Sequence, residues 1–374
     1  MKTIGAWFWK DKVFLIAWAA ALVSMLFVPP SLDYIGYINP KVLIIMFTLM
    51  IAVAGMYEAN FFSFVAIGLV SKFFTIKYIS LVIVVATYFL GMLVTNDAVL
   101  LTLVPFTLFV TKQTKMEKYA LLIVILQTIA ANMGSALTPM GDPQNIYLYA
   151  FYDIPFGTFL HAMAPITIMG FLLVTASTAV LIPNEYCEPI MVSPKVDWKR
   201  MAVYGAIFTN AFLAVLRVYS VWIGLVVTLI ISVPLCFRLW KKVDYHLLLT
   251  FTAFFIFTGN LGVLDSIGQA FERFLDTPAS VYFTGLFASQ FISNVPAAVL
   301  LSTFTERSLA LPLLQGVNVG AMGTLIGSLA SLITFKIVTK EFPGEMKAYL
   351  KTYTLLCILF IVVITGVVFF LFRY

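Results

Sequence analysis

The sequence predicts an all-α integral membrane protein, and both its composition and its long apolar runs support this. Of 374 residues, 62% are hydrophobic and only 11% are charged, against about 45–50% apolar and about 25% charged residues in ordinary soluble domains. A helix needs roughly 20 apolar residues to cross a bilayer, and the chain can supply about ten such segments. Too few charges remain to cover a water-facing surface, so a soluble globular enzyme, a disordered chain and a disulfide scaffold are excluded.

The apolar runs follow one another along the whole chain, so we expect a single membrane domain over residues 1–374. They lie at about 13–28, 41–57, 78–94, 98–111, 119–150, 159–182, 199–216, 219–237, 246–263, 278–305, 311–338 and 349–372. The first run follows Lys2, Lys10 and Lys12 and looks like a signal peptide. We predict an uncleaved first span instead, because the rest of the chain is equally apolar.

Two pairs of runs are expected to enter the membrane and return as re-entrant hairpins. Residues 78–93 and 98–110 are separated by Thr95–Asp97, and lysines flank both outer ends of the pair. Two segments whose outer ends share one side should go in and come back. The second candidate hairpin, 278–305, turns at Ser293–Pro296.

Two further runs are interrupted by residues that break helices. The run 119–150 contains a stretch rich in Asn, Gly and Pro from Asn132 to Asn145, and the run 311–338 contains a similar stretch from Asn318 to Gly327. Irregular backbone survives at membrane depth only where it is buried in protein or lines a cavity. We therefore expect two broken helices in the interior of the protein.

The basic residues predict the orientation in the membrane. With the N-terminus in the cytoplasm, about nine spans and two hairpins place most of the 23 basic residues in cytoplasmic loops, as the positive-inside rule requires. We expect a multi-pass protein of the inner (plasma) membrane. A net charge of +6 can indicate a protein that binds nucleic acid. Here the basic residues lie in short loops between apolar runs, which argues against such a partner.

The two halves of the chain resemble each other. The segment Thr95–Leu101 is echoed by Ser293–Leu301. The residues Asn132, Gly134, Thr138 and Gly141 recur as Asn318, Gly320, Thr324 and Gly327. The order of span, hairpin, broken helix and span repeats with opposite expected orientation, so we predict inverted repeats, which are typical of secondary transporters with a midplane site. Repeat 1 covers 41–182, a linker with two scaffold spans covers 183–241, and the inverted repeat 2 covers 242–374.

Three motifs resemble those of the ion transporter superfamily: T-N-D-A-V-L-L at 95–101, N-M-G-S-A-L-T-P-M-G-D-P-Q-N at 132–145 and S-N-V-P at 293–296. This superfamily holds arsenite permeases, certain sodium/proton antiporters, citrate–metal symporters and divalent-anion/sodium symporters. The resemblance implies that two hairpins and two unwound helices form one site. It also implies a scaffold domain, a transport domain, a homodimer and an elevator mechanism. The divalent-anion branch has Ser-Asn-Thr at both tips, so this chain looks closer to the arsenite permease and antiporter branches.

The candidate site residues are the polar groups of the tips and of the broken helices. Their amides, hydroxyls and freed carbonyls can bind an anion or offer oxygens to a cation. The candidate substrate ligands are Asn96, Asn132, Thr138, Ser293, Asn294, Asn318 and Thr324. The candidate cation ligands are Thr95, Asn96, Asp97, Gly134, Asp142, Asn145, Asn294 and Gly320. The alternatives are helix capping for the Asn residues and close packing for the glycines.

Two carboxylates, Asp97 and Asp142, lie well inside the expected membrane region. An acid at the bilayer centre costs about 2.5–3.5 kcal/mol on insertion scales, so such residues are usually functional. We expect Asp97 to be a sodium ligand or a proton carrier, whereas Asp142 before Pro143 equally fits a helix N-cap. No Lys or Arg is expected at the midplane, so an anion would depend on helix N-termini and a co-bound cation.

The sequence therefore predicts a secondary active transporter of a small anion, coupled to sodium or protons, and no enzyme. Sodium/proton antiport and arsenite efflux are alternatives within transport. A channel is the alternative outside it, although channels need selectivity rings, usually from several subunits. The sequence has no Walker A, GxSxG or paired His/Glu metal motif. The expected partners are a small anion, the lipid bilayer and a second copy, with Na⁺ as coupling ion and no cofactor.

Overall fold

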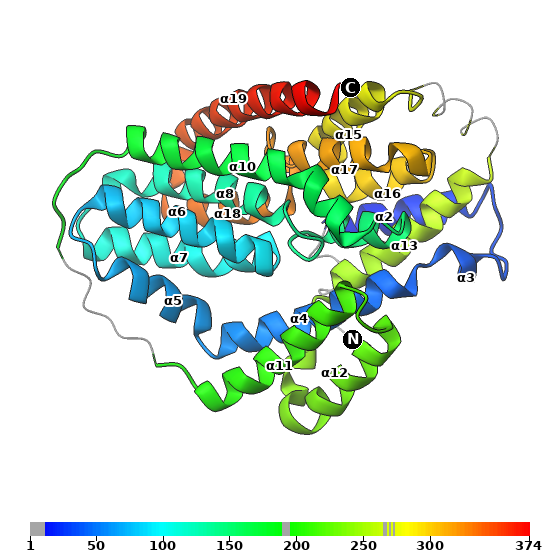
Figure 1. The fold of residues 1–374 in the computed structure, drawn as a ribbon, viewed down its shortest axis with the longest axis horizontal. Helices are drawn as coiled ribbons and strands as arrows, with labels where there is room; N and C mark the ends of the chain where they lie inside the picture. The colour runs from blue at the N-terminus through cyan, green and yellow to red at the C-terminus, as the bar shows by residue number, and fades with distance from the viewer. Residues whose placement is uncertain (1–11, 189–194, 265–267, 269–270, 272–273) are drawn as a thin grey trace.

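The computed structural model describes residues 12–188, 195–264, 268, 271 and 274–374. Over these residues the chain is built from helices, with one isolated β-bridge between Thr75 and Tyr186 (Figure 1). The all-α class predicted from the composition is therefore confirmed. The lysines Lys2 and Lys10 that were used to orient the chain lie outside the described residues.

Seven helices of the described residues are long and apolar enough to cross a membrane. They are Pro40–Glu58, Ile76–Leu93, Glu117–Ser135, Phe156–Leu181, Val221–Lys242, Tyr245–Gly262 and Pro343–Phe372. This supports the predicted multi-pass membrane protein. Two expected unbroken spans, 13–28 and 199–216, are not among these seven; they correspond to α2 (Lys12–Ser24), which has only 13 residues, and to α11 (Trp198–Val215).

Two helix pairs form where the polar tip motifs interrupt long apolar runs. The helices α6 (Ile76–Leu93) and α7 (Asn96–Gln113) are joined by two residues and pack on each other. The helices α15 (Pro278–Ile292) and α16 (Asn294–Ser302) are joined by Ser293 alone. The turns therefore lie at the Thr-Asn-Asp and Ser-Asn-Val motifs, which places both motifs at helix N-termini.

The two interrupted runs are divided where Gly and Pro gather. In the first, α8 (Ala120–Ser135) ends before residues 136–142, and α9 (Pro143–Phe151) begins with a proline whose missing N–H costs nothing at that position. In the second, α17 (Ala310–Val319) and α18 (Leu329–Glu341) are separated by a stretch containing a short 3₁₀ turn, η4 (Leu325–Gly327). Both breaks therefore match the predicted broken helices.

The helix pairs and the divided helices are interlocked. The pair α6–α7 packs on α8, and the pair α15–α16 packs on α17. In addition, α7 packs on α18 and α16 packs on α9. The second segment of each divided helix thus contacts the helix pair of the other half of the chain. We call these eight helices the centre of the fold; in Figure 1, α6 and α7 lie at the left, and α15, α16 and α17 lie at the right.

The remaining helices cover this centre. The helices α10 (Phe156–Leu181) and α19 (Met346–Phe372) pack on α8 along one side, at the top of Figure 1. Along the other side α4, α11 and α12 pack together, and α2 packs along α13. Their bounds are α4 (Pro40–Glu58), α11 (Trp198–Val215), α12 (Val221–Cys236) and α13 (Tyr245–Gly262). In the chain, the shorter α3 (Tyr34–Tyr37) precedes α4 and the shorter α5 (Phe61–Val70) follows it.

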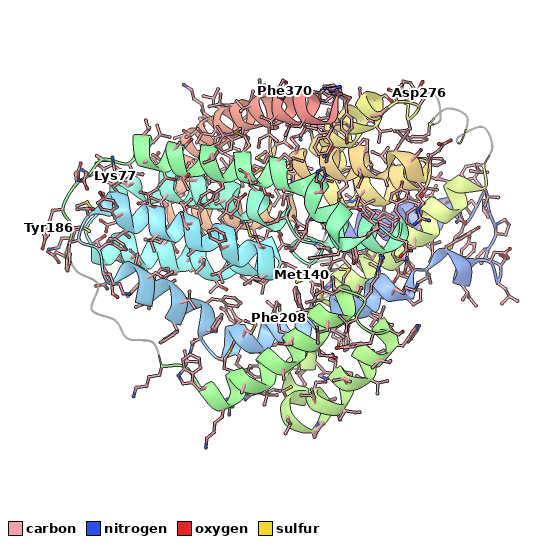
Figure 2. All side chains as sticks on the ribbon, in the orientation of Figure 1. Lys77, Met140, Tyr186, Phe208, Asp276 and Phe370 are labelled. Carbon is pink, nitrogen blue, oxygen red and sulfur yellow. The ribbon has the colours of Figure 1, made fainter. Side chains whose placement is uncertain are left out.

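Side chains fill the space between the two groups of helices. Met140, in the first break, is buried and lies near the middle of the molecule (Figure 2). Phe208 on α11 packs against two hydrophobic clusters, one around α8 and α17 and one around α4. Apolar packing therefore joins α11 to the centre and surrounds the polar residues of the two breaks.

Candidate functional site

The tip of α7 and the end of α8 meet through two buried asparagines. Asn96 Nδ2 donates a 3.0 Å hydrogen bond to Asn132 Oδ1, and the Asn96 N–H donates to the Gly141 carbonyl over 3.2 Å. Asn132 Oδ1 also accepts from Ser328 Oγ over 3.0 Å, and Asn132 Nδ2 donates to Ser331 Oγ over 3.1 Å. Asn132 therefore connects the first helix pair to the start of α18.

A second buried asparagine makes the corresponding connection from α17. Asn318 Nδ2 donates to Asn145 Oδ1 over 2.7 Å and to the Leu314 carbonyl over 2.8 Å. Asn318 Oδ1 accepts from Gln144 Nε2 over 3.4 Å. Asn318 therefore connects α17 to the start of α9, in the other half of the chain.

The two asparagines make reciprocal contacts. Ser331 follows Asn318 by the same number of residues as Asn145 follows Asn132. Each asparagine thus donates to the residue that corresponds, in the other half, to the one bonded by its counterpart. Such an exchange follows if the two halves have the same local structure and face each other.

The first break keeps its freed carbonyls bonded through Asn145. Its Nδ2 lies 3.3 Å from the carbonyl oxygens of Ser135 and Thr138 and 3.5 Å from that of Ala136. Because buried carbonyls must find a donor, this amide stabilises the unwound turn. Its Oδ1 is used by Asn318, so the predicted cation ligand Asn145 has most of its hydrogen-bonding capacity occupied within the protein.

The threonines of the two breaks bind corresponding carbonyls at the ends of the helix pairs. Thr138 Oγ1 donates to the Met92 carbonyl over 2.5 Å, and Thr324 Oγ1 donates to the Gln290 carbonyl over 2.9 Å. Gln290 also donates from Nε2 to two carbonyls of the second break and accepts from the Thr324 N–H over 2.8 Å. Thr138 and Thr324 therefore hold each break against its own helix pair.

The glycines Gly134 and Gly320 lie where α8 and α17 approach their helix pairs closely. A Cβ atom on Gly134 would lie 2.1 Å from the Tyr88 carbonyl oxygen, and one on Gly320 would lie 2.7 Å from the Leu286 carbonyl oxygen. Real Cβ atoms do not approach oxygen so closely, so only glycine fits at either position. Both glycines permit tight packing of α8 and α17 on their helix pairs.

The two tips share a local hydrogen bond but differ in backbone strain. Asn96 Oδ1 accepts from the Asp97 N–H over 2.8 Å, and Asn294 Oδ1 accepts from the Val295 N–H over 2.9 Å. Thr95 has a relaxed extended backbone, whereas Ser293 has φ 73° and ψ 154°, a region that almost only glycine occupies. Within the described residues, the hydrogen bonds of the Asn294 side chain stay inside its own tip.

The two buried acids have different surroundings. Asp142 holds the N-cap position of α9 without a side-chain capping bond, and its Oδ2 instead accepts from Ser135 Oγ over 2.7 Å. Asp97 Oδ1 is buried and finds no hydrogen-bond donor among the residues that the structure describes. An unpaired buried carboxylate oxygen is costly, so a proton, a cation or water is required there.

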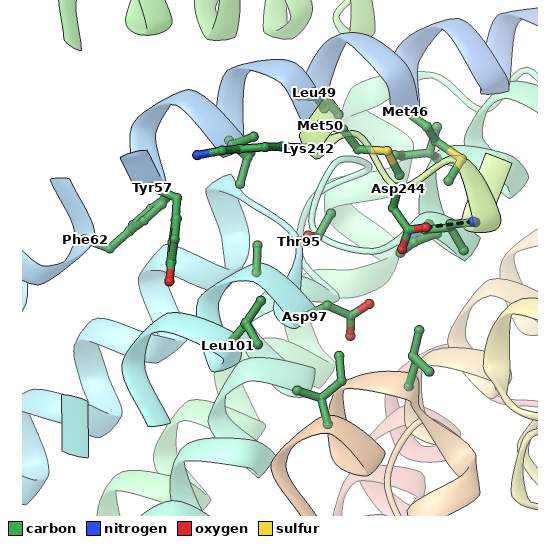
Figure 3. Close-up of a pocket in the computed structure, with 18 residues that line it drawn as sticks. Met46, Leu49, Met50, Tyr57, Phe62, Thr95, Asp97, Leu101, Lys242 and Asp244 are labelled. Atoms are coloured by element: carbon green, nitrogen blue, oxygen red, sulfur yellow. Dashed lines mark hydrogen bonds between the residues drawn. The ribbon is translucent and has the colours of Figure 1, made fainter. Parts of the chain in front are cut away.

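Asp97 opens into a pocket of about 360 Å³ between the centre of the molecule and α4 (Figure 3). Its walls are largely apolar and come from α4, α7, α9, α13 and α18. Its polar members include Thr95, Lys242 and Asp244. Asp142 and Asp244 are both near enough to Asp97 to interact with it electrostatically. In Figure 3, Asp97 and Asp244 lie on the same side of the pocket, while Lys242 extends toward Tyr57.

Lys242 and Asp244 are pocket residues that were not predicted from the sequence. Lys242 was expected to be an orienting charge in a cytoplasmic loop, and the structure also places it in the wall of the pocket. The Lys242 ammonium is 2.7 Å from Glu58 Oε2, and Glu58 also pairs with Arg238 and, more distantly, with Arg200. Lys242 is therefore ion-paired at the edge of the pocket, on a carboxylate that it shares with Arg238 and Arg200. Asp244 caps α13 by accepting from the Leu247 N–H, a local role of the kind that sequence can indicate. Its proximity to Asp97 depends on the fold and could not be read from the sequence.

Comparison with known proteins relates the chain to transporters. A family model described as citrate transporter matches residues 5–306. An uncharacterized transporter of Methanocaldococcus jannaschii is 30% identical over 317 residues, covering 84% of this chain and 86% of the relative. The inner membrane protein YbiR of Escherichia coli is 29% identical over 329 residues, covering 83% and 86%. An uncharacterized transporter of Mycobacterium tuberculosis is 24% identical over 302 residues, covering 74% and 70%.

These matches bear on the family to which the tip motifs belong. The predicted resemblance to the ion transporter superfamily is confirmed, and the matching model is that of its citrate branch rather than its arsenite permease branch. Transport rather than enzymatic catalysis is the activity to which both the family and the membrane-helical structure point. The chain belongs to the citrate transporter family of the ion transporter superfamily.

Proposed function

We propose that the protein is an ion-coupled secondary active transporter of a small anion, and that its site is the pocket beside Asp97. The observation that carries this proposal is the buried Oδ1 of Asp97, which lacks a donor among the described residues, on a side chain that lines a 360 Å³ pocket. A buried carboxylate oxygen without a donor is costly, and a cation or a proton bound at Asp97 would remove that cost.

The charges around the pocket favour coupling. The carboxylate of Asp97 lies near those of Asp142 and Asp244, and the one lysine that lines the pocket is paired with Glu58. An anion entering this pocket alone would meet negative potential. Binding of sodium or a proton first removes that repulsion, so the anion and the cation move together.

Helix N-termini supply the attraction for the anion. The first residues of α7, α9 and α18 line the pocket, at Asp97, Pro143 and Leu329. The N-terminus of a helix carries a partial positive charge and free N–H donors. We propose that the anion binds at the N-termini of these helices, and that the side-chain amides of Asn96 and Asn132 hold the helices in place around it. The family description favours a carboxylate such as citrate as the substrate class.

The predicted inverted repeats and elevator mechanism are part of the same proposal. The reciprocal bonds of Asn132 and Asn318, and the matching bonds of Thr138 and Thr324, support two halves with the same local structure. We assign repeats 1 and 2 to 41–182 and 242–374, with 183–241 as the scaffold of a homodimer. The name of the E. coli relative supports an inner-membrane location.

A cation exchanger is the second candidate. The same three carboxylates could pass sodium and protons alternately without any anion, and their excess over paired lysine favours cation binding. Ser293, Asn294 and Gly320 are not among the residues that line this pocket, so their role as ligands stays a prediction in either case.

A single panel distinguishes the two candidates. Purified protein is reconstituted into proteoliposomes, and uptake of labelled citrate, succinate, sulfate and arsenite is measured with an imposed sodium or proton gradient. We expect one carboxylate to accumulate only when a cation gradient is present. Sodium-dependent proton movement with no anion uptake would instead establish the exchanger, and uptake independent of both gradients would overturn coupling altogether.

A further inference from the structure

A second cavity, remote from the pocket, lies between the C-terminal ends of α7 and α18. It is a groove of about 480 Å³. Four residues with apolar side chains, Pro105, Leu108, Phe109 and Ile337, form part of its wall, and four charged residues, Lys112, Lys336, Lys340 and Glu341, form the rest. The groove therefore combines an apolar wall with an excess of positive charge.

The lysines of the groove are not neutralised by the protein. None of Lys112, Lys336 and Lys340 is within ion-pair distance of a carboxylate of the described residues, although Glu341 lines the same groove. Other lysines of the chain do find such partners, as Lys115 does with Glu188 and Lys118 does with Glu185. Three free ammonium groups that converge on one groove favour an anion.

The apolar wall narrows the class of anion. Phe109 is 40% exposed and Pro105 is also exposed, on the same face of α7 as Lys112. A small soluble anion would contact only the lysines and leave this wall uncovered. A molecule with a phosphate and an acyl chain covers both, because the chain packs on Phe109 while the phosphate reaches the ammonium groups.

The place of the groove in the fold agrees with a lipid. Lys112 lies in the last turn of α7, and Lys340 lies in the last turn of α18. The sequence predicts that both ends lie at the cytoplasmic surface, where basic pockets between helices bind anionic headgroups. We infer that this groove is a binding site for an anionic glycerophospholipid of the surrounding membrane, with the lysines on its phosphate and the apolar wall on its acyl chain.

Such a lipid would connect two helices that begin at the transport site. The helix α7 starts at Asn96 and α18 starts at Leu329, and the first turns of both line the pocket of Asp97. A lipid held between their far ends fixes the two helices relative to each other. Lipid binding at this groove does not depend on which ion the protein transports, because the groove and the pocket of Asp97 share no lining residue.

The test compares two lipids with the same acyl chains in detergent-solubilised full-length protein. We expect palmitoyl-oleoyl phosphatidylglycerol to raise the thermal midpoint more than palmitoyl-oleoyl phosphatidylcholine does. The triple variant Lys112→Gln, Lys336→Gln, Lys340→Gln should lose this difference. The variant Lys195→Gln, Lys199→Gln, Lys241→Gln, which removes three exposed lysines elsewhere, should keep it.

Two further arms separate binding of a whole lipid from a general effect of charge or from binding of phosphate alone. The triple Lys→Arg variant at the groove should keep the difference, which shows that charge and not folding is responsible. Glycerol phosphate without acyl chains should give no shift, and Phe109→Ala should weaken the shift by long-chain lipid. An equal shift with glycerol phosphate, or a full lipid effect in the triple Gln variant, would overturn the inference.

Discussion

Asn318 and Asn145 are joined by a 2.7 Å hydrogen bond, although 173 positions separate them in the chain. The bond joins the end of α17, the first segment of one divided helix, to the start of α9, the second segment of the other. Both asparagines are buried. Its counterpart joins Asn132 to Ser331. The two breaks are therefore held together by paired, buried polar contacts.

Asp97→Asn is expected to remove cation coupling without unfolding the protein. Asparagine keeps the shape of the side chain but carries no charge, so neither sodium nor a proton is required at the pocket. Gradient-driven uptake into proteoliposomes should be lost, while size-exclusion and circular dichroism profiles stay those of the wild type. Asp276→Asn, at an exposed acid, serves as the control. Wild-type gradient dependence in Asp97→Asn would show that Asp97 only supports the helix start.

Asn318→Ala is expected to lower the free energy of unfolding by about 1–3 kcal/mol, because Asn145 Oδ1 and Gln144 Nε2 lose their partner in a buried site. A double-mutant cycle with Asn145→Ala measures the direct term. Residues that share a buried hydrogen bond should couple by about 0.5–3 kcal/mol. Additive effects of the two substitutions would show that the bond contributes nothing of its own.

Gly134→Ala is expected to destabilise the protein, because the new Cβ atom meets the Tyr88 backbone oxygen at 2.1 Å and backbone cannot move aside cheaply. Overpacking of this kind costs about 1–3 kcal/mol. Gly366→Ala is the matched control in α19, where a Cβ atom would meet nothing within 4 Å. That change should be neutral or raise the thermal midpoint, since alanine favours helix. A fall as large as that of Gly134→Ala would show that close packing at Tyr88 is not the cause.

Ser293 distinguishes backbone strain from ligand binding. Its backbone at φ 73° favours glycine, so Ser293→Gly should stabilise the folded protein by about 1 kcal/mol through relief of strain. Ser293→Ala keeps the strain and should not. If the Ser293 hydroxyl binds substrate, both variants should raise the substrate concentration needed for half-maximal uptake. A transport defect in the alanine variant alone would assign the serine to backbone conformation.

Local signals in the sequence predicted the elements of this site well. The Gly- and Pro-rich stretches beginning at Asn132 and Asn318 act on their own backbone, so the breaks follow from composition. The turns at Asp97 and Ser293 follow from polar residues within apolar runs. In contrast, the partners Ser331, Gln290 and Asp244 were not predicted, because each satisfies a group that lies far away in the chain. The packing of the helices decides which donor reaches a freed carbonyl, and the sequence pattern alone does not identify that donor.

The interlocked packing of α7 on α18 and of α16 on α9 has a consequence for biosynthesis. When residues 76–151 have left the ribosome, the face of α7 that α18 will cover is still bare, and it stays so until residues 329–341 are made. Neither half closes its own core, so separately expressed halves should be unstable apart and recover structure when produced together. The order of synthesis thus sets an interval in which the first half needs lipid or an insertase to protect that face.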